Sequence, residues 1–255
     1  MLSNKAITSI LIIAVAVFLT IGGTALAQEI EELEDANVFI EWNFTDGDQG
    51  LQFFWDSEGF TRMMIFNTEE EKVLDLRTFR TVKRQGLTET SIESVEPEQS
   101  EQTLRQFFRR FPEGTWTFEG ELKEGSTVIN TIEGEAELTH DLLEPVEFTK
   151  IKLPVIKWDE PEVGIDGSPL EVVGYELVVE LVVEVDVDGE EEERVFKEVT
   201  NYPAGFTKHI VGNRFMKLIK NPPGEIVEGK VEILADEPSG NRTISEEFFI
   251  EPEDD

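Results

Sequence analysis

Residues 155–189 read VIKWDEPEVGIDGSPLEVVGYELVVELVVEVDVDG and contain the longest alternating run of the chain. Within the run, odd positions are apolar and even positions are mostly acidic. The odd set is Tyr175, Leu177, Val179, Leu181, Val183, Val185 and Val187, and the even set is Glu176, Val178, Glu180, Val182, Glu184, Asp186 and Asp188. Because successive side chains of a strand point to opposite faces, the run predicts a long strand with one face on a core.

The end of this run predicts a tight hairpin. The Asp188-Gly189 step suits the positive φ angles that a two-residue turn requires. The chain then returns through RVFKEV, residues 194–199. We therefore expect two long antiparallel strands at this place.

Short β-rich runs separated by turn signals fill the first half of the chain. VFIEWNF (38–44) and LQFFWD (51–56) alternate on either side of TDGDQG. Further runs of the same kind are FTRMMIFN (60–67), VLDLRT (73–78), TSIESVEP (90–97), TWTFEGELKEG (115–125), TVINTIEG (127–134) and EAELTH (135–140). This number of short strands is typical of a sandwich.

One helix is expected to interrupt the strands, over about residues 100–111. Ser100 is placed to be its N-cap, and Pro112 would end it. Its apolar stripe is Leu104, Phe107, Phe108 and Phe111, at i, i+3, i+4 and i+7. The other face carries Arg105, Arg109 and Arg110, which we interpret as a solvated face, with anion binding as the alternative.

These patterns predict an all-β protein of two β-sandwich domains. The first, residues 36–142, would contain the one short helix. A short linker at 141–145 would lead to a second domain over residues 145–252.

The second domain resembles a fibronectin type III domain. VIKWDEP with Trp158 matches strand B, and VVGYELVVE with Gly174-Tyr175 matches strand C. FTKHIV, PPGEIVEGKVEILA and NRTISEEFFI stand where strands E, F and G belong, although the tyrosine of the E–F corner is absent. The resemblance implies a fibronectin-like sandwich.

The first half resembles the N-terminal part of a group of uncharacterised exported bacterial proteins. The residues that carry this resemblance are FFWDSEGFTRMMIFN, RFPEGTWTFEGEL and ELTHDL. No activity follows from it.

The charge of the chain limits its partners. Among 255 residues, 55 acidic side chains face 22 Lys and Arg, and the formal net charge is −33. Nucleic acid is not expected as a partner, because phosphate binding needs basic side chains. The same repulsion disfavours an anionic membrane surface.

The N-terminus predicts export. Lys5, an apolar stretch from Ala6 to Ile21, and Ala25-Leu26-Ala27 have the layout of a signal peptide over residues 1–27. The mature chain would then begin with an acidic segment, residues 28–35, in the periplasm or outside the cell, without a membrane span. An uncleaved N-terminal membrane anchor is the alternative. The chain has no cysteine, which excludes disulfides and thiol chemistry.

Two kinds of binding site can be placed on residues. Glu184, Asp186 and Asp188 share one strand face, and Asp46 and Asp48 flank a glycine. Their oxygens suit a hard cation such as calcium, and a solvated acidic face is the alternative interpretation.

The second kind of site is aromatic. Phe53, Phe54 and Trp55 are consecutive, so one ring points away from the others, and Phe54 with Trp116 is the candidate ligand-binding pair. Burial between two sheets is the alternative interpretation.

No motif for nucleophilic catalysis is present, and the two histidines, His140 and His209, lie in strand contexts. We therefore expect a non-catalytic binding or structural module of the cell envelope or exterior, whose partner would be a protein or polysaccharide. A polysaccharide hydrolase that uses paired carboxylates is the alternative, which leaves the enzyme question open.

Overall fold

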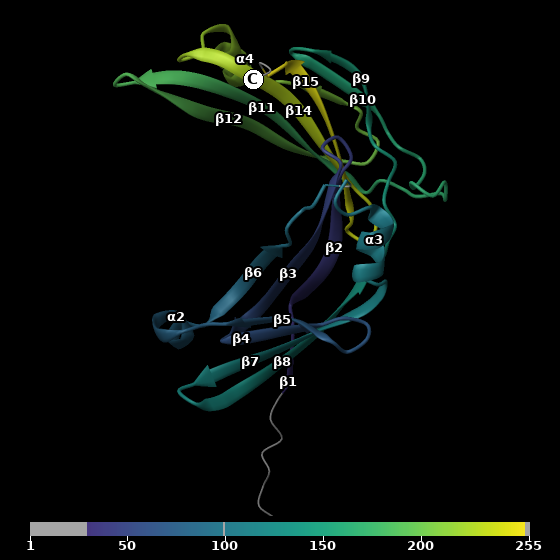
Figure 1. Ribbon diagram of the computed structural model, residues 1–255, viewed down its shortest axis with the longest axis vertical. Coiled ribbons are helices and arrows are strands. Elements are labelled where there is room, and N and C mark those ends of the chain that lie inside the picture. Colours follow the sequence, from purple (N-terminus) through teal and green to yellow (C-terminus); the bar gives the residue numbers. More distant parts are fainter. Residues whose placement is uncertain (1–29, 99, 253–255) are drawn as a thin grey trace, which may run out of the picture.

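The computed structural model describes residues 30–98 and 100–252, so the expected signal peptide lies outside the described residues. The described chain is dominated by strands (Figure 1). In chain order the elements are β1 (Ile30–Glu32), β2 (Asp35–Asn43), β3 (Asp48–Phe60), β4 (Arg62–Phe66), β5 (Lys72–Arg77), α2 (Arg80–Gln85), β6 (Leu87–Glu93), α3 (Leu104–Arg110), β7 (Gly114–Glu124), β8 (Thr127–Leu138), β9 (Glu147–Lys152), β10 (Val155–Asp159), β11 (Gly174–Val187), β12 (Glu190–Pro203), β13 (Lys208–Ile210), α4 (Asn213–Lys220), β14 (Glu225–Asp236) and β15 (Arg242–Ile250). The prediction of an all-β fold of sandwich type is confirmed.

The largest element is a seven-stranded sheet that passes through both halves of the chain. Its order is β12-β11-β14-β15-β2-β3-β6. β15 and β2 pair in parallel, with Thr243 opposite Trp42. Figure 1 shows this pair, yellow beside purple, where the upper and lower halves meet. The two halves therefore share backbone hydrogen bonds.

In the first half, a five-stranded sheet of order β1-β8-β7-β4-β5 packs against the β2-β3-β6 part of the large sheet. Alternation along each strand supplies the core between them. Its largest fully buried members include Trp55, Phe60, Met63, Trp116 and Phe118. Burial of such large apolar side chains is the main favourable contribution to the stability of this half.

In the second half, a three-stranded sheet of order β13-β10-β9 faces the β12-β11-β14-β15 part of the large sheet. The segments expected as strands B and E are β10 and β13, which pair with each other. Those expected as C, F and G are β11, β14 and β15, which lie side by side in the other sheet. This division of strands is that of an immunoglobulin-like sandwich, which supports a fibronectin type III-like fold for this half.

The alternating run becomes β11, and its odd residues from Tyr175 to Val183 are buried as expected. Asp188 and Gly189 have φ angles of 57° and 88°, which confirms the predicted hairpin turn. On the even face, Glu180 is also buried. Its carboxylate is compensated by Lys197, directly opposite on β12.

The predicted helix is shorter than expected and its N-cap is a different residue. α3 begins at Leu104, with Thr103 rather than Ser100 as its cap. Thr103 Oγ1 accepts from the backbone N–H of Gln106, and Oε1 of Gln106 accepts from the backbone N–H of Thr103. This reciprocal capping box satisfies two helix N–H groups, whereas the hydroxyl of Ser100 bonds to Glu98.

The junction between the halves centres on Asn241, which is 1% exposed. Its Oδ1 accepts from the backbone N–H of Ile40 at 2.7 Å. Its Nδ2 donates to the carbonyls of Thr139 and Asp141 at 3.2 and 2.8 Å. The segment expected to be a linker is packed here as well, since Leu142 and Leu143 are each 1% exposed.

Candidate functional site

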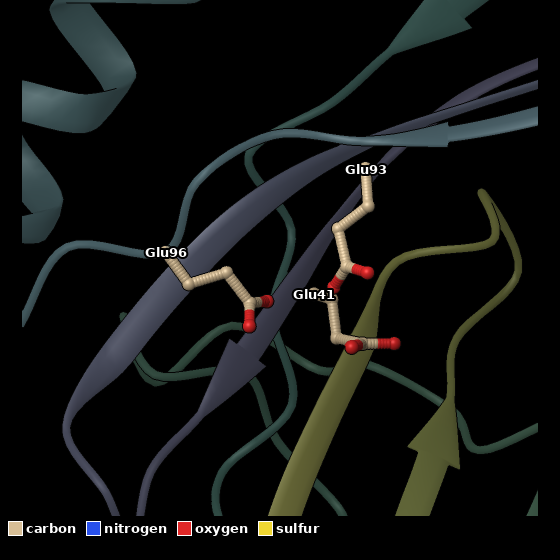
Figure 2. A group of neighbouring side chains, drawn as sticks. All are labelled: Glu41, Glu93 and Glu96. Atoms are coloured by element: carbon tan, nitrogen blue, oxygen red, sulfur yellow. The ribbon is translucent and has the colours of Figure 1, made fainter.

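Three glutamates converge on the outer face of the large sheet, near the junction (Figure 2). Glu41 comes from β2, Glu93 ends β6, and Glu96 lies in the loop that follows. One carboxylate oxygen of each lies within 4.8 Å of the others. We call these three residues the glutamate cluster.

A glycine makes room for the glutamate cluster. Gly50 stands directly opposite Glu41 in the pairing of β2 with β3. A Cβ atom at position 50 would lie 2.7 Å from Oε1 of Glu96. Any larger residue would therefore displace the Glu96 side chain from the cluster.

Burial and mutual repulsion alter the acidity of the cluster. Loss of solvent, followed by the charges of Glu93, Asp48 and Glu41, raises the pKa of Glu96 to about 7. Loss of solvent also raises the pKa of Glu41, although the guanidinium of Arg242 opposes the shift. Glu96 can therefore hold or release a proton near neutral pH.

The arrangement is able to do two kinds of chemistry. Three carboxylates within one coordination sphere are suitable ligands for a hard cation such as calcium. A carboxyl group with a pKa near 7 beside two further carboxyl groups is also a combination that can supply a general acid. Five cavities among the described residues are lined by other side chains, so the cluster lies outside these cavities.

The hairpin carboxylates predicted to bind metal lie apart from this cluster. Asp186 Oδ1 accepts from the backbone N–H of Gly189 at 2.9 Å, and Asp188 forms the turn itself. The pKa of Glu184 is raised, first by the charge of Glu191. In the described part of the chain, the glutamate cluster is the one group of three or more ligand side chains within 4.8 Å. Calcium binding at the hairpin stays a prediction.

The second pair of carboxylates predicted to bind a metal ion lies at the β2–β3 turn. Asp46 accepts from Nδ2 of Asn43 at 2.9 Å. Loss of solvent raises the pKa of Asp48, with the charges of Asp46, Glu246 and Glu98 as further causes. The role of Asp46 and Asp48 in metal binding also stays a prediction.

The structure does not bring the two candidate aromatic residues together on a surface. Phe54 is half-buried in β3, whereas Trp116 is fully buried on β7. The ring of Trp116 packs against Phe53, and its Nε1 donates to the carbonyl of Pro112. The indole of Trp116 therefore offers no exposed ring to a ligand.

His140 is held by the first half rather than by its neighbour Asp141. Its ring stacks on Phe108, with centroids 4.1 Å apart, and Nε2 lies 2.7 Å from the carbonyl oxygen of Phe111. The carbonyl of Asp141 accepts from Asn241. These contacts fit a structural role for His140 at the end of α3.

A polar chain of three side chains was not expected from the sequence. Nδ1 of the buried His209 lies 2.7 Å from the hydroxyl of Tyr202, and Nε2 lies 3.0 Å from Oε1 of Glu198. Glu198 also accepts from the backbone N–H of Gly212, ahead of α4. The alternation along β12, which places Glu198 on the same face as Phe196 and Tyr202, is the signal that could have revealed it.

Helices give no indication of a membrane span: in residues 30–98 and 100–252, they are too short and too polar to cross a bilayer. No family model and no curated protein matches the chain.

Several solved structures are similar to the chain at low scores. A two-domain fibronectin type III segment of chicken tenascin is 10% identical, with a TM-score of 0.26 over 86% of this chain and 99% of that one. A tetra-tandem repeat from the extending region of a large adhesion protein is 11% identical, with a TM-score of 0.21, over 84% of this chain and 48% of that one. A structure of a 1.5-MDa bacterial ice-binding adhesin is 11% identical, with a TM-score of 0.23, over 87% and 66%. Similarities at this level do not establish a function.

Proposed function

We propose that this protein is an exported, non-catalytic binding or structural module in which two sandwiches act as one rigid body. The observation that carries the proposal is the seven-stranded sheet that continues from one half into the other. A shared sheet holds the halves at a fixed angle, as a spacer or a display surface requires. The N-terminal signal pattern supports a place in the periplasm or outside the cell.

The distribution of functional groups supports binding over broad surfaces. The glutamate cluster lies on an outer sheet face, and the large sheet has further charged side chains in the second half, where Lys197 pairs with Glu180 and Lys230 with Glu246. Partners at such a surface are proteins or polysaccharides of the exterior.

The test is capture of a partner by the purified protein. The protein is immobilised and exposed to envelope proteins and culture polysaccharides of its host, and the bound material is identified. Saturable binding that is lost when the immobilised protein is unfolded supports the module. Turnover of a polysaccharide without stable binding would contradict it.

One observation favours the hydrolase alternative, namely the raised pKa of Glu96 beside Glu41 and Glu93. The assay is the release of reducing ends from envelope polysaccharides. Activity that is lost in Glu96→Gln but kept in Glu119→Gln, an exposed glutamate of β7, would assign the protein to the hydrolases.

We also propose that calcium binding stabilises the protein, and substitutions can identify the residues that bind the ion. Melting temperatures are compared in calcium and sodium at equal ionic strength, because screening alone stabilises an acidic protein. A calcium-specific increase that disappears in Asp186→Asn with Asp188→Asn would place the ion at the hairpin. If it disappears instead in Glu41→Gln with Glu96→Gln, the ion binds the glutamate cluster. Superimposed curves for wild type would refute calcium binding.

A further inference from the structure

The outer face of the three-stranded sheet carries four exposed lysines. Lys150 and Lys152 belong to β9, Lys157 to β10 and Lys208 to β13. The register places both Lys150 and Lys208 directly opposite Lys157, so three ammonium groups form a row across three strands. The four lysines are called the lysine face.

The lysine face is not neutralised within the molecule. In the described part of the chain, no ion pair involves any of its four residues, although acidic side chains outnumber basic ones by 55 to 22. Like charges directly opposite on neighbouring strands are destabilising. A row of this kind is therefore stabilised by an acidic partner from outside the molecule.

The same chain carries a matching row of carboxylates. Glu184 of β11 stands directly opposite Glu193 of β12 on one side and Glu225 of β14 on the other. We call these three residues the glutamate row. Like charges directly opposite on neighbouring strands repel each other, so this row also lacks compensation among its own members.

The two rows correspond in spacing and in their surroundings. Each spans three adjacent strands, which lie about 4.8 Å apart in any sheet. Beside the row of Lys150, Lys157 and Lys208, an apolar pair is formed by Val155 and the exposed Ile210. Beside the glutamate row, an apolar pair is formed by Val182 and the exposed Val195. A charged row beside an apolar row therefore occurs on both faces.

The rows lie on opposite faces of the C-terminal half. The lysine face is on the β13-β10-β9 sheet, and the glutamate row is on the outer side of the β12-β11-β14 part of the large sheet. Figure 1 shows β9 and β10 on one side of the upper half, and β11 and β12 on the other. One molecule can thus offer both surfaces at the same time.

We propose that the lysine face of one copy docks on the glutamate row of a second copy. The contact joins two different surfaces, so it repeats and gives open chains of copies rather than a closed dimer. This inference goes beyond the proposed module and holds whether or not that module binds an external partner.

Ionic strength decides between this attraction and the repulsion of two highly acidic molecules. At about 0.15 M salt the Debye length is about 8 Å, so the net charge of −33 is screened between distant surfaces while facing side chains still interact. At about 1 M salt it is about 3 Å, and the exposed ion pairs are screened as well. We expect association at the lower salt concentration and monomers at the higher one.

The experiment is sedimentation velocity of the purified protein and two neutralised variants. One variant carries Lys150→Gln, Lys157→Gln and Lys208→Gln, and the other Glu184→Gln, Glu193→Gln and Glu225→Gln. A matched control carries Arg214→Gln, Lys217→Gln and Lys220→Gln, which removes three exposed charges from α4. Wild type and control are expected to form a concentration-dependent series of oligomers, and each variant alone is expected to be monomeric.

The equimolar mixture of the two variants gives the decisive result. Each retains the surface that the other lacks, so the mixture is expected to form particles of twice the monomer mass that do not grow further. A monomeric wild type at both salt concentrations would overturn the proposal. Oligomers of the lysine variant alone, or lysine-dependent binding of an anionic polysaccharide to a monomeric wild type, would overturn it as well.

Discussion

At the scale of single residues, Asn241 connects more of the molecule than any sequence pattern suggested. It lies between a turn and a strand in the polar stretch SGNRT, residues 239–243, and nothing adjacent in the chain distinguishes it from its neighbours. Its role depends on Ile40, Thr139 and Asp141, which lie 100 or more residues away in the sequence. Contacts over such separations are not visible in local periodicity.

Replacing Asn241 by alanine is expected to destabilise the protein strongly. The change leaves the N–H of Ile40 and the carbonyls of Thr139 and Asp141 without partners in a buried junction. Unpaired buried groups cost about 1–3 kcal/mol each, so we expect a loss of about 3 kcal/mol in the free energy of unfolding. Equilibrium denaturation measures it, with Asn201→Ala on the exposed edge of β12 as the control. Equal stabilities of the two variants would contradict the role of the junction.

The glutamate cluster was equally inaccessible from the sequence. Glu41, Glu93 and Glu96 come from separate segments of a chain with 55 acidic residues, so no spacing distinguishes them. The predicted carboxylates at Asp46 and Asp48 were marked by a turn glycine, which is a local signal. Clustering across strands depends on sheet register and can be observed only in the fold.

Glu96 is expected to make stability depend on pH in an unusual direction. Its pKa is raised from 4.5 to about 7 in the folded protein, so between these values the folded state holds a proton that the unfolded chain releases. The stabilisation is therefore present below about pH 4.5 and lost as the pH rises through 7. The side chain of Glu96→Gln resembles the protonated glutamate, so the free energy of unfolding of this variant should equal that of wild type at low pH.

Above pH 7, the same variant should be more stable than wild type by on the order of 1 kcal/mol, a value reduced for partial solvent screening. Denaturation curves of both proteins across this pH range provide the measurement. Glu119→Gln is the control, and it should show no such divergence. A constant difference between Glu96→Gln and wild type would show that the cluster does not titrate in this range.

At the scale of elements, alternation was a reliable guide and helix boundaries were not. The strand with Tyr175 and Leu177 on its inner face, and its turn at Asp188, follow directly from a period of two. The residue that caps α3 could not be predicted, because both Ser100 and Thr103 are suitable residue types and only the side-chain geometry distinguishes them. α4 begins at Asn213 without a side-chain cap, so its start carried no local signal.

The cap of α3 can be tested by two parallel substitutions. Thr103→Ala removes a hydroxyl that accepts a helix N–H, and it is expected to cost about 1 kcal/mol of the free energy of unfolding. Ser100→Ala is expected to be almost neutral, since Ser100 bonds only to the exposed Glu98. Chemical denaturation separates the two. A larger loss at Ser100 would restore the boundary expected from the sequence.

At the scale of the whole molecule, the sandwich class of each half could be predicted, but the sheet that unites them could not. The sheet is continuous because Arg242–Ile244 pairs with Glu41–Asn43. These two segments are about 200 residues apart in the sequence, and each is only three residues long. Short parallel contacts of this kind have no local sequence signature.

The shared sheet predicts that the two halves unfold together. Separate domains on a linker would give two calorimetric transitions, whereas one sheet gives a single transition whose van't Hoff and calorimetric enthalpies agree. Differential scanning calorimetry of wild type is expected to show the single transition. Asn241→Ala, which weakens the junction, is expected to lower the temperature of this transition. Two transitions in wild type would mean that the junction does not couple the halves.

The outermost strand of the large sheet has a consequence of a different kind. β12 runs over 14 residues at the edge of the sheet, where backbone N–H and C=O groups can recruit foreign strands and lead to aggregation. Its first four residues, Glu190 to Glu193, place consecutive negative charges along that edge, and charge is a usual protection against such pairing. The protection depends on ionisation, which glutamates lose near pH 4. In acid we therefore expect aggregation to begin at this strand, and light scattering at falling pH measures it.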